Sequence, residues 1–380
     1  MLAKALAVVA LAAVAVAAST APPARGASTL PSTAQLRTLR AQLLSTAEQG
    51  VATVSRLTWN AKAGWYNDFL YNGAGHMPLA RLWSAFPLFE TLAGIAAADP
   101  TAANRTALRQ FADKAAQLYW NPKLKPVGGY EWYPGLRSAR STAYFDDSGW
   151  WGLAFVDAYR VTRDAAYLAD AHRAFVFIVG AGWDPRRGGV WWETQHRHKT
   201  AEPLAAAVLI GTWLYKTRHK AWYLQQTQKL LRWADARAFD RKRGLYTRSA
   251  TDATAMDYVQ GLMIAAHAEL CHVLHRPALC AKARSLMTAS LHAFGDDLAW
   301  APQYDVVYLR WLLDYYARSG DTRAYALAVH NAQRALAHAR DARGNWVNDW
   351  NGRWIADGLE EDAATLELFA WTAAAPLPSG

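Results

Sequence analysis

The sequence has little of what would identify several common classes of protein. Its 380 residues contain two cysteines, Cys271 and Cys280, which are too few for a disulfide framework. The Gly-x-Ser-x-Gly, phosphate-loop and dinucleotide-binding motifs are absent from the sequence. His196 and His198 lie two positions apart, without the further ligands that a zinc site needs. We therefore expect neither a bound metal nor a cofactor.

The two cysteines lie on either side of residues 274–277, which we interpret as a connection between two helices. Export from the cell would allow a single disulfide between them. Two free thiols buried as small apolar side chains fit the sequence equally well. The sequence leaves both possibilities open.

Long apolar runs are also scarce, and one of them lies at the amino terminus. Lys4 is followed by an apolar run from Ala5 to Ala18 and then by a stretch rich in proline and small residues. This order is typical of a secretory signal peptide. We interpret residues 1–27 as a signal peptide and residues 28–380 as a single domain. We expect a secreted protein, extracellular or periplasmic, with no stable membrane insertion after signal removal, and a monomer.

The formal net charge of +10 favours association with anionic surroundings. The basic residues are scattered along the chain, and nucleic acid is a poor partner for an exported protein, so we expect no nucleic-acid binding. An anionic polymer of the cell envelope and a merely solvated basic surface are both compatible with this charge.

Helical periodicity runs through nearly the whole chain, and no β alternation of any length accompanies it. The pattern predicts an all-α protein with about twelve helices. They cover residues 34–55, 80–97, 103–119, 148–162, 165–179, 201–216, 221–236, 257–273, 278–293, 304–318, 322–338 and 359–373.

A repeat is superimposed on this helical pattern. Tyr167, Tyr223 and Leu279 follow one another at intervals of 56 positions, each just after a tight connection between two helices. A two-helix unit of this size must stack on its neighbours to bury its apolar face. Roughly six such hairpins could form an open solenoid or close into a ring; we favour closure, with the long loops gathered at one end.

An acidic pair, Asp146-Asp147, stands out in one of these long loops. Phe145 precedes it, and Trp150 and Trp151 follow. An isolated pair of this kind most often caps a helix or fills its first turn. Two carboxyl groups beside aromatic rings also suit glycoside cleavage, because one carboxyl protonates the leaving oxygen while the other meets the developing positive charge. A second aromatic loop, 182–192, supports the chemical interpretation.

These residues resemble glycoside hydrolase family 76. The segment 144–151, Tyr-Phe-Asp-Asp-Ser-Gly-Trp-Trp, is similar to the central motif of that family, and segment 182–192 is similar to its next loop. The segments 258–261 and 346–352 add weaker similarities, in the same order. The resemblance implies an (α/α)6 barrel and an endo-acting, retaining α-1,6-mannanase whose partner is an α-mannan-like polysaccharide or oligosaccharide.

Carried over by position, the resemblance makes Asp146 the nucleophile and Asp147 the general acid/base. A retaining enzyme needs its two carboxyl groups about 5–5.5 Å apart, and we expect adjacent residues just before a helix to reach that separation. The candidate substrate-binding residues are Tyr144, Trp150, Trp151, Trp191, Trp192, Tyr258 and Gln260.

Three alternatives use the same barrel. One is another (α/α)6 enzyme, such as an epimerase or an unsaturated glucuronyl hydrolase, although these lack the Asp-Asp-x-Gly-Trp-Trp arrangement. A transglycosidase would transfer the glycosyl group to an acceptor sugar instead of water. A glycan-binding protein would have kept the barrel and lost turnover, a possibility raised by Thr200 and Thr247, which stand where the family carries other polar residues. Glu193 could touch sugar hydroxyls or remain a loop carboxylate, and we interpret Glu360-Glu361-Asp362 as a helix start.

Overall fold

The computed structural model describes residues 30–71 and 78–378. The predicted signal peptide lies outside these residues. In the described part of the chain there are twelve α-helices, as the periodicity predicts. They are α1 (Thr33–Thr58), α2 (Leu82–Ala98), α3 (Ala102–Tyr119), α4 (Phe145–Thr162), α5 (Ala165–Phe177), α6 (Ala201–Arg218), α7 (Ala221–Arg237), α8 (Asp257–Leu274), α9 (Pro277–Phe294), α10 (Pro302–Ser319), α11 (Thr322–His338) and α12 (Leu359–Ala374).

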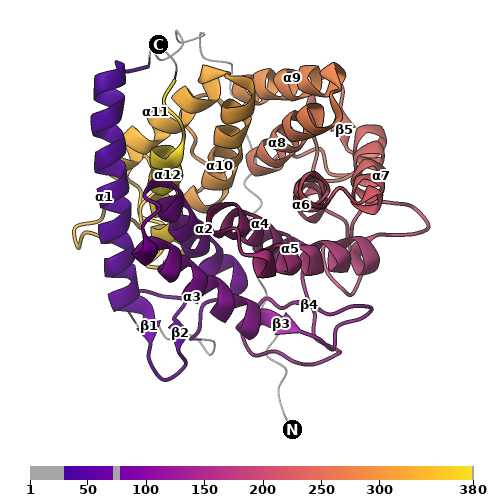
Figure 1. Ribbon diagram of the computed structural model, residues 1–380, viewed down its shortest axis with the longest axis horizontal. Coiled ribbons are helices and arrows are strands. Elements are labelled where there is room, and N and C mark those ends of the chain that lie inside the picture. The colour runs from indigo at the N-terminus through magenta and orange to yellow at the C-terminus, as the bar shows by residue number, and fades with distance from the viewer. Residues whose placement is uncertain (1–29, 72–77, 379–380) are drawn as a thin grey trace.

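The even-numbered helices form a closed inner ring (Figure 1). Each packs on the next, from α2 through α4, α6, α8 and α10 to α12, and α12 packs back on α2. The odd-numbered helices lie outside this ring, with α1 against α12 completing the sixth hairpin from the two ends of the chain. This arrangement is the closed (α/α)6 barrel that the sequence predicts.

The two layers differ in how they are buried. Helix α6 is buried at every position from Ala201 to Leu214 because it contacts neighbours all round. Helix α7 buries residues on one face only, at spacings of three and four such as Tyr223, Thr227 and Leu230. An outer helix with a single apolar face and an inner helix apolar all round are what a two-layer barrel requires.

Glycines allow two pairs of inner helices to come close together. A Cβ atom at Gly149 of α4 would lie 2.6 Å from Ala206 Cβ of α6. A Cβ atom at Gly261 of α8 would lie 2.9 Å from the backbone of Tyr308 in α10. Such distances are too short for any side chain, so these glycines serve close helix packing.

The 56-residue repeat recurs in the structure. Arg163, His219 and His275 end α4, α6 and α8 in the left-handed conformation, with φ of 61°, 52° and 52°. Each is followed at once by the next outer helix, so the tight connections lie at the carboxyl ends of the inner helices. The long loops consequently gather at the opposite end, as predicted.

In the described parts of these long loops there are three short hairpins, where the sequence shows no strand. They pair β1 (Trp59–Asn60) with β2 (Trp65–Tyr66), β3 (Trp120–Asn121) with β4 (Gly129–Tyr130), and β5 (Phe239–Asp240) with β6 (Leu245–Tyr246). Two-residue strands are too short to show a periodic pattern.

Three further observations complete the fold. Helix α5 continues as a π-helix, η1 (Ile178–Gly182), which leads into the second aromatic loop. Cys271 and Cys280 form a disulfide between α8 and α9, which settles the question that the sequence leaves open. None of the described helices is both long and apolar enough to span a membrane.

Candidate active site

The acidic pair lies at the loop end of the barrel, in the first turn of α4. The helix begins at Phe145, three residues earlier than the periodicity predicts, and Tyr144 is its N-cap without a side-chain capping bond. Asp146 and Asp147 are therefore inside the helix and not just before it, which corrects the expectation from the sequence, and neither caps it. Carboxylates are favoured in a first turn because they face the positive end of the helix dipole. Successive helical residues point about 100° apart, so the two side chains face different neighbours.

Asp146 faces the second aromatic loop. Trp192 donates a hydrogen bond from Nε1 to Asp146 Oδ2 at 2.6 Å, and the Asp147 backbone N–H donates to Asp146 Oδ1 at 3.0 Å. Burial and the nearby charge of Glu202 raise the pKa of Asp146 to about 7, while these two donors act in the opposite direction. Both oxygens of Asp146 are thus held in place by donors that favour the ionised form.

Asp147 faces α2 and α12. Burial and the charge of Asp146 raise the pKa of the Asp147 carboxyl well above its usual range, and Glu360 acts in the same direction. Arg81, just before α2, lowers this pKa in part. In the described residues, no hydrogen-bond donor contacts the Asp147 carboxyl group. Its environment therefore favours the protonated form.

The second aromatic loop is braced against the start of α4. The Phe145 backbone N–H donates to the Trp192 carbonyl at 2.8 Å. Glu193 is fully buried and accepts from the backbone N–H groups of Gln195 at 2.6 Å and Arg197 at 3.0 Å. These bonds assign Glu193 to the loop's own structure, as a buried carboxylate and not as the surface carboxylate that the sequence offers as one alternative. They also fix the place of the Trp192 indole.

Aromatic rings from four elements line up beside the pair. Trp83 of α2 lies 5.2 Å from Trp150 of α4, and Trp150 lies 5.8 Å from Tyr258 of α8, between ring centroids. Tyr258 stacks on Tyr304 of α10 at 5.5 Å, and Trp300 is half exposed beside both. Trp150 and Tyr258 thus lie near the acidic pair, as expected, and are the most buried members of this aromatic group. Trp83, Trp300 and Tyr304 are members that our sequence analysis missed.

A third carboxyl group, Glu202, lies in the first turn of α6 near Asp146. It is buried, pairs with Arg248 Nε at 3.4 Å, and accepts a weak hydrogen bond from Tyr258 Oη at 3.5 Å. Burial raises the pKa of Glu202, and Arg248 opposes this shift. Glu202 is not among the residues expected from the sequence, although Asp146, Glu202 and Tyr258 are spaced 56 positions apart. The repeat was therefore the signal that could have found it.

The first turn of α12 contributes further acids on the Asp147 side. Residues 360–362 do start a helix, as predicted, but Glu360 is buried and lies 3.7 Å from Arg81 Nη2. Burial raises the pKa of Glu360, and Arg81 lowers it in part. Arg81 is itself held by Asp68, whose Oδ2 accepts from Arg81 Nε at 2.9 Å. One guanidinium group thus serves three surrounding carboxyl groups, those of Asp68, Asp147 and Glu360.

Three residues expected to contact the sugar have side chains that point away from the acidic pair. Trp151 is fully buried and packs on Tyr119 at 5.2 Å, because it is turned toward the outer layer whereas Trp150 is turned inward. Gln260 is fully buried, and its side-chain amide bonds both backbone groups of Tyr246 at 2.9 Å. Trp191 is stacked on His196 at 5.3 Å, on the face of the extended loop opposite to Trp192. Burial corrects the expectations for Trp151 and Gln260 to structural roles, whereas the expectation for Trp191, which is partly exposed, stays a prediction.

The remaining expected residue, Tyr144, lies next to the pair. Its ring is 4.9 Å from the Trp192 ring, and burial together with the charge of Asp147 raises its pKa. In the part of the chain that the structure describes, no group of three His, Cys, Asp or Glu side chains is arranged to hold a metal ion.

The sequence profile of glycosyl hydrolase family 76 matches residues 65–376, most of the chain and all twelve barrel helices except α1. The chain belongs to this family. No curated protein sequence matches it. The barrel and its family assignment thus agree with the resemblance carried by segments 144–151 and 182–192.

Solved structures of family 76 share the fold of this glycoside hydrolase. A family 76 α-mannanase from Bacteroides thetaiotaomicron superposes with a TM-score of 0.79 at 16% identity, covering 89% of this chain and 98% of the other. An inactive double aspartate-to-asparagine variant of an α-1,6-mannanase from Salegentibacter sp., in complex with α-1,6-mannotriose, gives 0.68 at 13% identity, covering 87% and 99%. A cellobiose 2-epimerase from Bacillus thermoamylovorans gives 0.67 at 12% identity, covering 88% and 99%. At these identities the likeness shows the fold alone.

Proposed function

We propose that this family 76 glycoside hydrolase cleaves α-1,6-linked mannan with retention of configuration, with Asp146 as the nucleophile and Asp147 as the general acid/base. The observation that carries the proposal is the contrast between two adjacent carboxyl groups. The oxygens of Asp146 hold two N–H donors, one from Trp192, whereas the environment of Asp147 favours its protonated form.

The contrast assigns the two roles. An ionised carboxylate stabilised by donors suits attack on the anomeric carbon, and a carboxyl group of raised pKa suits proton donation to the departing oxygen. In the first step Asp146 forms a glycosyl ester as the Asp147 proton passes to the leaving group. In the second step Asp147 takes a proton from water, and the resulting attack releases the sugar with its original configuration.

The surrounding rings supply the sugar platform. Tyr144, Trp192 and Trp300 are at least partly exposed, and Trp150 with Tyr258 forms the aromatic base beneath them. Flat rings of this kind pack against the apolar face of a sugar. The mannan substrate is supported by the family and by the mannotriose complex of the structural neighbour. We further propose that the enzyme is exported, on the strength of its apolar amino-terminal segment.

The test is a pair of isosteric variants, Asp146→Asn and Asp147→Asn, assayed on α-1,6-linked mannooligosaccharides. We expect both to lose hydrolysis by a factor of about 10³ or more, with unchanged far-UV circular dichroism. Asp297→Asn, in the other Asp-Asp pair of the chain, is the matched control and should retain activity. Wild-type-like turnover by both variants would refute the assignment.

Two further readouts separate the roles and the alternatives. NMR of the first-formed product should show the α-anomer, since two displacements restore the configuration. Added azide should rescue Asp147→Asn on a substrate with an activated leaving group. Departure of such a group in the first step needs no acid, and azide, unlike water, attacks in the second step without a base. Product analysis with an added acceptor sugar distinguishes transglycosylation from hydrolysis. Oligosaccharide binding without any cleavage by the wild type would indicate a glycan-binding protein instead.

A further inference from the structure

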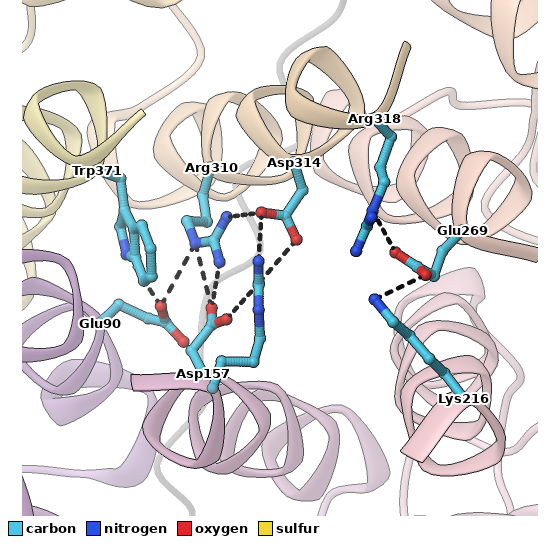
Figure 2. Close-up of polar contacts among 9 residues, drawn as sticks. Glu90, Asp157, Lys216, Glu269, Arg310, Asp314, Arg318 and Trp371 are labelled. Carbon is cyan, nitrogen blue, oxygen red and sulfur yellow. Dashed lines mark hydrogen bonds and ion pairs between the residues drawn. The ribbon is translucent and has the colours of Figure 1, made fainter. Parts of the chain in front are cut away.

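The end of the barrel opposite the acidic pair contains a buried network of charges (Figure 2). Arg310 of α10 is fully buried and donates to Asp157 Oδ2 of α4 at 2.7 Å and to Asp314 Oδ1 at 2.9 Å. Arg160 of α4 donates to the same two carboxylates, at 2.7 Å and 2.8 Å. Nearby Glu90 has its pKa raised well above its usual range by burial and by Asp157. Two cations are therefore matched by two carboxylates.

Beside this network lies a second group of charged side chains, in which the cations outnumber the carboxylates. Lys216 of α6 and Arg318 of α10 both point at Glu269 of α8, each at 2.9 Å (Figure 2). In the described residues this is the one carboxylate that either cation pairs with. Burial lowers the pKa of Lys216; Glu269 opposes this shift, and the positive charges of Arg318 and Arg160 add to it. The group therefore carries one positive charge in excess.

These cations border a cavity of about 630 Å³ at the carboxyl ends of the inner helices. Arg160, Lys216 and Arg318 line it, together with Arg105 of α3 and Arg163 at the end of α4. Arg105 is partly buried and Arg163 is exposed at the rim, and neither forms an ion pair with a described residue. The Nε atom of Arg105 is also buried without a hydrogen-bond partner there. Leaving a buried charged donor unsatisfied is costly unless a ligand completes it.

The charge around the cavity thus exceeds neutrality by about three, from Arg105, Arg163 and the Lys216–Arg318–Glu269 group. The negative ends of the helix dipoles offset part of this excess. The Arg105 Nε still lacks an acceptor among the described residues. An anion in the cavity would supply that acceptor and offset the remaining positive charge.

We propose that this cavity is a binding site for a phosphate group, either as free phosphate or as the phosphate of an ester. A dianion matches an excess of about three positive charges better than a monocarboxylate does, and its oxygens accept bidentate bonds from guanidinium groups. The volume lies within the range of small-molecule sites and exceeds what phosphate alone would fill. The site is separate from the acidic pair and does not depend on the proposed mechanism.

The experiment is calorimetric titration of the purified enzyme at constant ionic strength. The ligands titrated into the enzyme are inorganic phosphate, mannose 6-phosphate, mannose and chloride. We expect phosphate to bind with one site per chain, mannose 6-phosphate to compete with it for that site, mannose not to compete with it, and chloride to give no heat. Tighter binding of mannose 6-phosphate would identify an ester as the fitting ligand, and tighter binding of inorganic phosphate would identify the free anion.

Two variants test the location. Arg105→Gln/Arg163→Gln removes both unpaired cations of the cavity and should weaken phosphate binding at least about tenfold. Arg276→Gln makes the same change at an exposed residue of the same barrel end, outside the cavity, and should bind like the wild type. Melting curves verify folding. Absence of phosphate binding by the wild type, or equal weakening in both variants, would overturn the proposal.

Discussion

Replacing Trp192 with Phe isolates one hydrogen bond of the candidate nucleophile. The substitution removes the Nε1–H donor 2.6 Å from Asp146 Oδ2 and keeps an aromatic ring at the position. A hydrogen bond to a charged group contributes about 1.5–3 kcal/mol, and each pKa unit corresponds to about 1.4 kcal/mol. Loss of the donor should therefore raise the pKa of Asp146 from about 7 by a further 1 to 2, roughly.

The expected result follows from the sign of this change. Attack requires ionised Asp146, so activity should rise with pH through the pKa of this group. In the variant the acidic limb of kcat/KM should move upward by about 1 to 2 pH units, since kcat/KM reports the free enzyme. At pH 6 the variant should be about 10- to 100-fold slower than the wild type. The two enzymes should converge above the shifted limb.

The assay is kcat/KM from pH 4.5 to 9.5 on an α-1,6-linked mannooligosaccharide. Trp191→Phe is the matched control, because the neighbouring indole stacks on His196 and makes no bond to Asp146. Its acidic limb should coincide with that of the wild type. If the Trp192 variant loses activity by the same factor at every pH, the hydrogen bond does not set the pKa of Asp146 and our reasoning is wrong.

Three further predictions concern stability. Burial and Glu360 raise the pKa of Glu361 to about 8, and a carboxyl that binds its proton more tightly when folded contributes stability at low pH that is lost as the pH rises from about 4.5 to 8. Glu361→Gln should therefore raise Tm by a few degrees at pH 8.5 and hardly change it at pH 4. Equal changes in Tm at the two pH values would contradict this prediction. Arg310→Met leaves Arg160 as the one cation paired with the two buried carboxylates of Asp157 and Asp314 and should cost about 3–5 kcal/mol in urea unfolding, whereas a loss below about 1 kcal/mol would contradict the importance of the Arg310 pairs. Cys271→Ser/Cys280→Ser opens a disulfide of sequence separation 9 and should cost about 2–3 kcal/mol, measured as a lower Tm that a reducing agent no longer changes; an unchanged Tm would refute it.

Part of the site could have been predicted further from the sequence than we took it. The 56-residue repeat equates Asp146 with Glu202 and Tyr258, and all three lie in first turns at the same end of the barrel. Arg81 and Trp300 carry no such signal. They reach the site from the loops before α2 and α10, whose paths depend on tertiary contacts that local sequence does not encode.

By itself the sequence determined the helices, their pairing into repeats and the acidic motif, because these rest on apolar spacing and on neighbours along the chain. Tertiary structure alone decided what each side chain at the motif faces. Trp150 and Trp151 are chemically the same, yet one turns toward the aromatic group of the site and the other into the core. Asp146 meets the Trp192 indole whereas Asp147 faces Arg81 and Glu360. Adjacent helical residues diverge by about 100°, so closure of the barrel, which sets the neighbour in each direction, gives two identical aspartates different environments.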